Sequence, residues 1–351
     1  METSLLMFQT YAEVYHKESQ YRNGIDFNSL CTYGVKCLDD AMLAIAKNEL
    51  IVMGAGSGYG KTELALHISR TNALNGKKVA HYNLEGGSRE AVQRMKWKDM
   101  CDLYFAEHKG EFFELDYRKW VLNKEPSSLL IELEAKVYNN LKDKIGENLY
   151  LYDHSGGLNC RNFCESLVKL EGLKADMSLD PQLRKHIGGI VNLDLIVIDH
   201  LHYFSLDKDE DEIREITEIL KTVKIITEEM QIPVILVAHL RKLPRGHGVP
   251  DKEDVYGTSN ICKIANTVII ISPEHEKDDP MNGLYPTYFR IAKSRQGLRP
   301  NVLISSIFDI HTRQYSKDYE LYRCNAMGEV AGEPIPWNDR PRWAKTYEVK
   351  T

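Results

Sequence analysis

The sequence predicts an α/β protein, in which a mainly parallel central sheet is flanked by helices and ends in an antiparallel strand pair. Two observations lead to this prediction. Short apolar runs alternate with longer segments of helical spacing, and a glycine-rich turn joins one such run directly to a helix. The length of 351 residues suits one large α/β domain with insertions, or two modest domains.

Each element follows from hydrophobic periodicity and from the residues that end strands and helices. Buried strands are predicted at 49–55, 78–85, 148–155, 193–204, 232–240 and 265–273. Helices are predicted at 61–76, 88–108 and 211–230. The segments 287–295 and 301–309 have the pattern of an antiparallel pair across "QGLRP".

The chain is expected to contain three regions. A short N-terminal helix and linker cover 1–33, the α/β domain covers 34–315, and a C-terminal extension covers 316–351. Inside the domain, the polar stretch around 97–147 has a helical pattern and is interpreted as an insertion.

Composition limits the partners that the chain is expected to have. The 43% hydrophobic and 27% charged content is ordinary for a globular protein, and no run reaches the roughly 18 apolar residues of a membrane helix. The N-terminus has no secretory-signal pattern, and the seven scattered cysteines fit reduced thiols, which together predict a cytoplasmic protein without membrane partners. With a net charge of -6, nucleic acid binding would depend on local basic patches.

The strongest motif is "AGSGYGKT", which lies between a predicted strand and a predicted helix. Its residues are Ala55, Gly56, Ser57, Gly58, Tyr59, Gly60, Lys61 and Thr62. Glycines let such a loop curl so that backbone N–H groups and a helix N-terminus face a phosphate. This predicts an ATP site in which Lys61 reaches the β/γ-phosphates and Thr62 holds Mg²⁺. A glycine-rich turn without a ligand is the alternative.

Three polar residues end other predicted strands, where ligands of parallel sheets bind. Asp199 ends "LIVID" and is a candidate second-shell group for Mg²⁺, the alternative being a helix cap or turn residue. Glu85 ends "VAHYNLE", a strand that is expected to lie next to the phosphate loop, and is a candidate base for an attacking water, or an ordinary acidic strand end. His239 ends "IPVILVAH" and is a candidate γ-phosphate sensor, or a satisfied strand-end histidine.

Lys293 and Arg295 lie two residues apart near the end of a predicted strand, so both should project from one face. An exposed basic edge that prevents aggregation would explain them. The order of the motifs favours another explanation.

The motifs follow one another in a characteristic order and spacing. After the phosphate loop and the strand glutamate come "DLIVIDHLHYF", "EIREITEILKTVK", "IPVILVAHLRK", "ANTVIII" and "IAKSRQG". In these motifs the chain resembles the RecA-like P-loop ATPase domain of DnaB-like hexameric replicative helicases, over roughly residues 34–312. The histidine of "VAHLRK" is similar to the phage and mitochondrial primase-helicase branch.

The resemblance implies roles for individual residues. "NLEGGSREAVQRM" places Glu85 as the water-activating glutamate, Asp199 matches the second acidic position, and His239 matches the phosphate sensor. Lys293 and Arg295 match "KxRxG", whose basic residues reach the nucleotide site of a neighbouring subunit. The resemblance therefore implies a head-to-tail homo-oligomer, most simply a hexamer, because a monomer cannot supply these basic residues to its own nucleotide site.

The sequence departs from the family around the DNA-facing loops. The segment 205–212 is acidic and would repel phosphates, and "VYGTS" at 255–259 lacks the arginine of the family's "LRxSG". The basic candidates that remain for DNA are Arg241, Lys242 and Arg245, with Lys252 nearby. An ordinary surface connection is the alternative for this loop.

The expected function is ATP-dependent translocation on single-stranded DNA and duplex unwinding, with a loader or primase as a further partner. The departures leave a second hypothesis open: a non-unwinding RecA-like ATPase that acts as a nucleotide-gated assembly, regulatory or defence module. A recombinase-like filament is a third.

Overall fold

The computed structural model describes the chain in segments. They are residues 10–108, 116–124, 127–152, 158–171, 192–204, 212–242, 248–257, 260–274, 279, 281–295, 302–325 and 327–345. The chain divides into two compact units, Met1–Leu30 and Cys31–Thr351. In the first unit, α1 (Tyr11–Asn23) begins with a capping box between Thr10 and Glu13 and buries none of its side chains, and η1 covers Phe27–Ser29.

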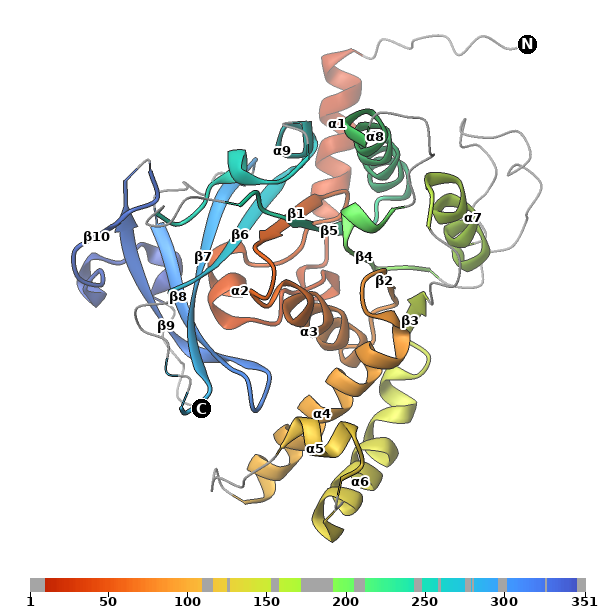
Figure 1. Cartoon of the computed structure of the whole chain (residues 1–351). Helices are drawn as coiled ribbons and strands as arrows, with labels where there is room; N and C mark the ends of the chain where they lie inside the picture. The colour runs from red at the N-terminus through yellow and green to blue at the C-terminus, as the bar shows by residue number, and fades with distance from the viewer. Residues whose placement is uncertain are drawn as a thin grey trace. The chain divides into compact units, whose positions relative to one another are not determined.

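Ten strands of the described residues form one mixed sheet, in the order β10-β9-β8-β7-β6-β1-β5-β4-β2-β3 (Figure 1). The mutually parallel strands are β1 (Leu50–Ala55), β2 (Val79–Asn83), β3 (Leu149–Tyr152), β4 (Leu195–Asp199), β5 (Val234–His239) and β6 (Thr267–Pro273). The antiparallel strands are β7 (Leu284–Ser294), β8 (Val302–Asp309), β9 (Gln314–Cys324) and β10 (Val330–Ala331). The predicted fold class is confirmed.

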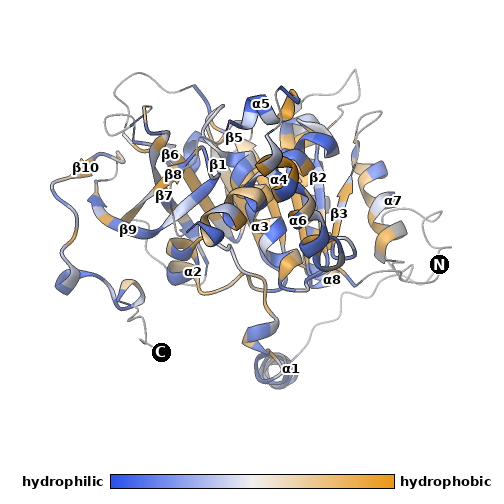
Figure 2. Cartoon of the chain, turned by 90° about the horizontal axis from the view of Figure 1, so that it is seen from below, coloured by the Kyte–Doolittle hydropathy of each residue, from blue (hydrophilic) through white to orange (hydrophobic). Residues whose placement is uncertain are grey.

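Helices cover both faces of the parallel half, so its strands are apolar on both sides. Leu50 and Val52 pack in the cluster formed with α7 (Cys160–Glu171), α8 (Glu212–Met230) and α9 (Asn260–Ile264). Ile51 and Met53 face the opposite cluster, which contains side chains of α2 (Lys36–Met42) and α3 (Lys61–Leu74). Figure 2 shows the hydrophobic segments gathered in the strands between these helices.

Helices also fill the region where an insertion is predicted. These are α4 (Gly87–Glu107), α5 (Tyr117–Val121) and α6 (Ser128–Ile145). Trp97 and Tyr104 of α4 pack with Leu133 and Val137 of α6 in a core of their own. The indole Nε1 of Trp97 donates to the main-chain carbonyl of His311 at 2.9 Å, which ties these helices to the β8–β9 turn.

The antiparallel part is larger than predicted. The expected pair, β7 with β8, is present, and β9 and β10 extend it. The sequence of β9, "QYSKDYELYRC", mixes charges with aromatics, so its strand pattern is weak. β7 lies between β6 and β8 and is not an edge, so the explanation of Lys293 and Arg295 as an edge-protecting pair is wrong.

Among the described helices, none combines the length and apolar character that crossing a bilayer requires. No group of three or more histidine, cysteine, aspartate or glutamate side chains in the described part of the chain is arranged to hold a metal ion by itself.

Candidate nucleotide site

Parallel pairing brings the predicted site residues to one edge of the sheet. Ala55 of β1 is in register with His239 of β5, and Asn83 of β2 is in register with Asp199 of β4. All four residues end their strands, so their side chains and the loops that follow lie at the carboxyl edge, where ligands of open α/β sheets bind.

The loop between β1 and α3 has the conformation that its glycines allow. Gly58 and Gly60 have φ values of 82° and 78°, in the left-handed region where a side chain is unfavourable. Lys61 begins α3 and is only 5% exposed. The loop therefore presents a helix N-terminus and a buried ammonium group to whatever lies beside it, which suits a phosphate.

A cavity of about 670 Å³ opens beside this loop. Its polar wall includes Lys61, Glu85 and Arg94. The apolar wall comes from the antiparallel strands and contains Tyr285, Phe308, Ile310 and Tyr315. The volume lies within the range of small-molecule sites, and a polar end opposite an aromatic end suits a nucleotide.

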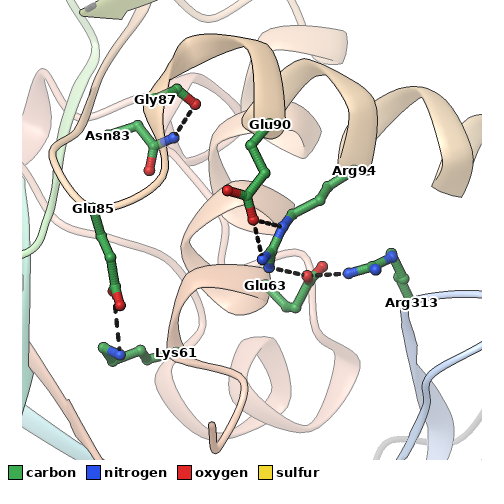
Figure 3. Close-up of polar contacts among 8 residues, drawn as sticks. All are labelled: Lys61, Glu63, Asn83, Glu85, Gly87, Glu90, Arg94 and Arg313. Atoms are coloured by element: carbon green, nitrogen blue, oxygen red, sulfur yellow. Dashed lines mark hydrogen bonds and ion pairs between the residues drawn. The ribbon is translucent and has the colours of Figure 1, made fainter. Parts of the chain in front are cut away.

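Glu85 contacts two nitrogen atoms across this edge. Its Oε2 lies 3.5 Å from Lys61 Nζ (Figure 3) and 3.5 Å from His200 Nε2. The strand β2 ends at Asn83, two residues before the predicted end at Glu85, and β4 and β5 separate it from β1. Glu85 therefore reaches the phosphate loop because it stands on the connection after β2, and the prediction that its strand lies next to the loop is wrong.

Asp199 is fully buried at the end of β4, and neither of its carboxylate oxygens has a hydrogen-bond partner among the described residues. Burial raises the Asp199 pKa to about 6, although nearby Thr62 and Lys61 oppose the shift. An unpartnered carboxylate beside a threonine hydroxyl offers the hard oxygen atoms that Mg²⁺ prefers, while phosphates and water would complete its shell. These residues fit the predicted ion.

A charge network at the cavity wall was not predicted. Arg94 bonds Glu63 at 2.5 Å and also binds Glu90, while Arg313 from the β8–β9 turn binds the same Glu63 (Figure 3). The Arg313 guanidinium also lies 4.2 Å from the ring centre of Tyr117 in α5. The (i, i+4) spacing of Glu90 and Arg94 on a predicted helix could have indicated their ion pair. The pairing of residues 63 and 313 was not visible in the sequence.

His239 lies in a cluster of imidazoles. Its ring centre is 4.2 Å from that of His200 and 5.7 Å from that of His202. Burial lowers the His239 pKa, with a further contribution from Lys61. A neutral imidazole close to the phosphate loop can accept or donate one hydrogen bond without adding charge.

Lys293 and Arg295 point toward the end of α9 in their own chain. Lys293 Nζ donates to the carbonyls of Cys262 and Ala265, both at 2.7 Å, and of Lys263 at 3.1 Å. Arg295 donates to the Lys263 carbonyl at 3.3 Å. Two cations thus satisfy carbonyls at a helix C-terminus. Neither lines the cavity of the same chain.

The structure describes only part of the predicted DNA-binding segment. Arg241 and Lys242 are exposed directly after β5, and the Arg241 main chain is held by the carbonyl of Asp254. Arg245 and most of the acidic segment 205–212 lie outside the described residues. Within 248–257, Lys252 pairs with Glu253, and Asp251 and Asp254 leave this stretch with an excess of negative charge.

Replacing Asp199 with asparagine should stabilise the chain in the absence of nucleotide. The Asp199 pKa is about 6 instead of 3.8, so ionisation favours unfolding increasingly as the pH rises from 3.8 to 6, and by a constant amount above that. The limit is about 3 kcal/mol. Urea unfolding at about pH 7.5 and about pH 5 should give a larger gain at the higher pH, with exposed Asp318→Asn as a neutral control. A gain independent of pH would contradict the assignment.

Comparison with known proteins connects this arrangement to a family of helicases. Residues 171–316 match the DnaB-like helicase C terminal domain family. The chain is 22% identical over 289 residues to replicative DNA helicase DnaB of Leifsonia xyli, covering 76% of this chain and 52% of that protein. It is 25% identical to replicative DNA helicase DnaC of Bacillus subtilis, covering 91% of this chain and 62% of the relative. The chain thus spans about half to two thirds of these curated relatives.

Two solved structures share the fold. One is a separate ATPase domain, which superposes with a TM-score of 0.66 at 15% identity, over 88% of this chain and 99% of that one. The other, a DnaB-like replicative helicase described with its interactions with primase, gives 0.64 at 15% identity over 88% of this chain and 67% of that one. The predicted resemblance to the DnaB-like helicases is therefore confirmed, and the chain carries a RecA-like fold with residues 171–316 matching their C-terminal domain.

Proposed function

We propose that the chain is an ATP-hydrolysing motor of the DnaB-like type, which moves on single-stranded DNA and unwinds duplex. The observation that carries the proposal is that Lys61, Thr62 and Glu85 line the nucleotide-sized cavity, and that the buried carboxylate of Asp199 lies next to these three residues. A phosphate-binding lysine, a base and an acid for the metal are what phosphoryl transfer to water requires. The likeness to named replicative helicases supports DNA as the polymer on which the motor acts.

Each residue has a distinct task in this scheme. The loop amides and Lys61 bind the β- and γ-phosphates, and Glu85 accepts a proton from the attacking water. Thr62 and Asp199 would hold Mg²⁺, with Asp199 acting through water, and the ion would neutralise charge on the phosphates. In the structure, Lys61 lies beside Glu85 at 3.5 Å, so binding of a triphosphate would draw the lysine toward the phosphates and leave the carboxylate available as a base.

The proposed assembly is a head-to-tail ring, most simply a hexamer. Lys293 and Arg295 do not reach the cavity of their own chain, and they lie together after β7 on the carbonyls of α9. A subunit that binds head-to-tail would receive both cations at its nucleotide, where Arg295 would stabilise charge that develops on the γ-phosphoryl group. A loader or primase would be a further partner of the ring.

One observation favours the second candidate, a non-unwinding nucleotide-gated assembly or regulatory module. The stretch 248–257, which follows Arg241 and Lys242, carries three acidic residues and one basic residue, which weakens the case for contacts with DNA phosphates there. His239 and the exposed Arg241 and Lys242 favour the motor, because they link the nucleotide site directly to this segment.

ATP turnover with and without single-stranded DNA, together with strand displacement on a forked duplex, separates the two candidates. The wild-type chain should hydrolyse ATP faster with DNA and displace the strand, and Lys61→Ala should lower turnover about 100-fold or more. Lys221→Ala, which removes an exposed lysine of α8, serves as the matched control. DNA-independent turnover without displacement would support the regulatory candidate, and normal turnover by Lys61→Ala would remove the phosphate-loop assignment.

Sharing of the site between subunits should appear in a mixing experiment. Arg295→Ala and Glu85→Ala should each bind nucleotide but hydrolyse little ATP. In a random 1:1 mixture, about one quarter of head-to-tail interfaces would combine an intact Glu85 with an intact Arg295 from the neighbour. Turnover should therefore recover partly, and the failure of every mixing ratio to exceed the separate variants would exclude an Arg295 that acts in trans.

Charge reversal of Arg241 and Lys242 should weaken DNA binding and its salt dependence. If both contact phosphates, the slope of log affinity against log salt should fall by about 1.4 for a single strand. The matched control reverses Lys317 and Arg323, which are exposed on β9, with β8, β7, β6 and β1 between that strand and β5. A slope that stays at the wild-type value would exclude the two residues as phosphate contacts.

A further inference from the structure

His200 is a buried imidazole next to the candidate base. It directly follows Asp199 at the end of β4, is 1% exposed, and has its Nε2 atom 3.5 Å from Glu85 Oε2. This nitrogen has no hydrogen-bond partner among the described residues. A buried polar atom without a partner is costly, so its direction toward a carboxylate calls for a functional explanation.

The backbone determines which nitrogen of His200 carries the proton. The main-chain N–H of His202 donates to His200 Nδ1 at 3.3 Å. A nitrogen that accepts a hydrogen bond has no proton, and a neutral imidazole carries one proton in total. The proton therefore resides on Nε2, and the N–H group that results faces Glu85.

The two partners of Glu85 differ in what happens to them when a nucleotide binds. Among the described residues, Lys61 and His200 are those within ion-pair distance of its carboxylate. A triphosphate would compete for Lys61, because that residue begins α3 behind the phosphate loop. His200 has no such alternative. Its ring is packed at 4.2 Å between ring centres against His239 and at 4.7 Å against Tyr203, so it keeps its position.

We propose that His200 is a positioning residue for Glu85, whose Nε2–H donates to the carboxylate and holds it toward the attacking water once Lys61 is occupied by phosphate. The present distance of 3.5 Å is longer than a hydrogen bond, and contacts of this kind shorten in the complex with substrate. His200 exchanges no proton during the reaction; Glu85 accepts the proton of water. This inference rests on the proposed ATP hydrolysis.

Two amide replacements separate the two nitrogens of the ring. In His200→Asn, the short side chain can still accept from the His202 N–H, as Nδ1 does, but it ends before Glu85. In His200→Gln, the amide N–H₂ extends to the place of Nε2 and can donate to Glu85. The full-length chain would be assayed for ATP turnover over a range of ATP concentrations, with thermal unfolding and binding of a fluorescent ADP analogue to establish that each variant is folded.

The expected result is a loss of kcat in His200→Asn by about 10- to 100-fold with an unchanged KM, because positioning acts on the transition state and not on nucleotide binding. His200→Gln should recover most of this loss. In a Glu85→Gln background, His200→Asn should lower the remaining turnover by less than about twofold, since both changes affect the same group.

Three results would overturn the inference alone, in a wild-type chain that hydrolyses ATP. These are wild-type kcat in a folded His200→Asn, equal losses in both amide variants, or a rise of KM that accounts for the loss. Absence of ATP hydrolysis by the wild-type chain, with and without single-stranded DNA, would instead overturn the proposed function and this inference together.

Discussion

The parallel register of β2, β4, β5 and β1 is the constraint on which the site depends. Asn83 lies beside Asp199 and Ala55 lies beside His239. Ile198 of β4 pairs with Leu236 of β5, so β5 runs about two residues beyond β4, and the four strands end at the same edge of the sheet. Because successive side chains of a strand alternate between faces, a shift of one residue would exchange the faces of every side chain in β4. Asp199 and the buried apolar residues that precede it are therefore placed by the same pairing, and the core fixes the geometry of the polar edge.

That edge holds several buried polar atoms without a hydrogen-bond partner among the described residues. Among the described residues, neither the Asp199 carboxylate nor His200 Nε2 has a hydrogen-bond partner, although both side chains are buried. Groups of this kind reduce the stability of the free chain, and a ligand that supplies their partners restores it. The cores on the two faces of the sheet, which include α8 on one side and α3 on the other, make such a site tolerable. The gathering of unpartnered polar atoms at this edge, beside the phosphate loop, is what favours a binding site over a structural turn.

The sequence predicted the six parallel strands, because most of them are buried apolar runs. The largest difference is at β4, which ends at Asp199 and not at the predicted residue 204. It also predicted which residues would meet at the edge. It did not predict contacts that depend on the antiparallel half, such as that of Arg313 with Glu63, since 250 positions separate these residues. The attachment of Lys293 to α9 was equally hidden, because α9 has five residues and too little periodicity to be recognised. The roles of the site residues remain predictions that the geometry supports.

The imidazole cluster extends the consequences of nucleotide binding beyond the base. His200 contacts both Glu85 and His239. His239 ends β5, and Arg241 follows it by two residues. His202 continues the series, since its Nε2–H can donate to the main-chain carbonyl of Tyr256 at 3.3 Å. The segment after β5 is thus joined to the nucleotide site at two points. His239 joins the start of the segment, and His202 joins it near residue 256. A motor needs such a physical connection between hydrolysis and the segment that meets the strand, and a continuous series of packed rings and hydrogen bonds can supply it.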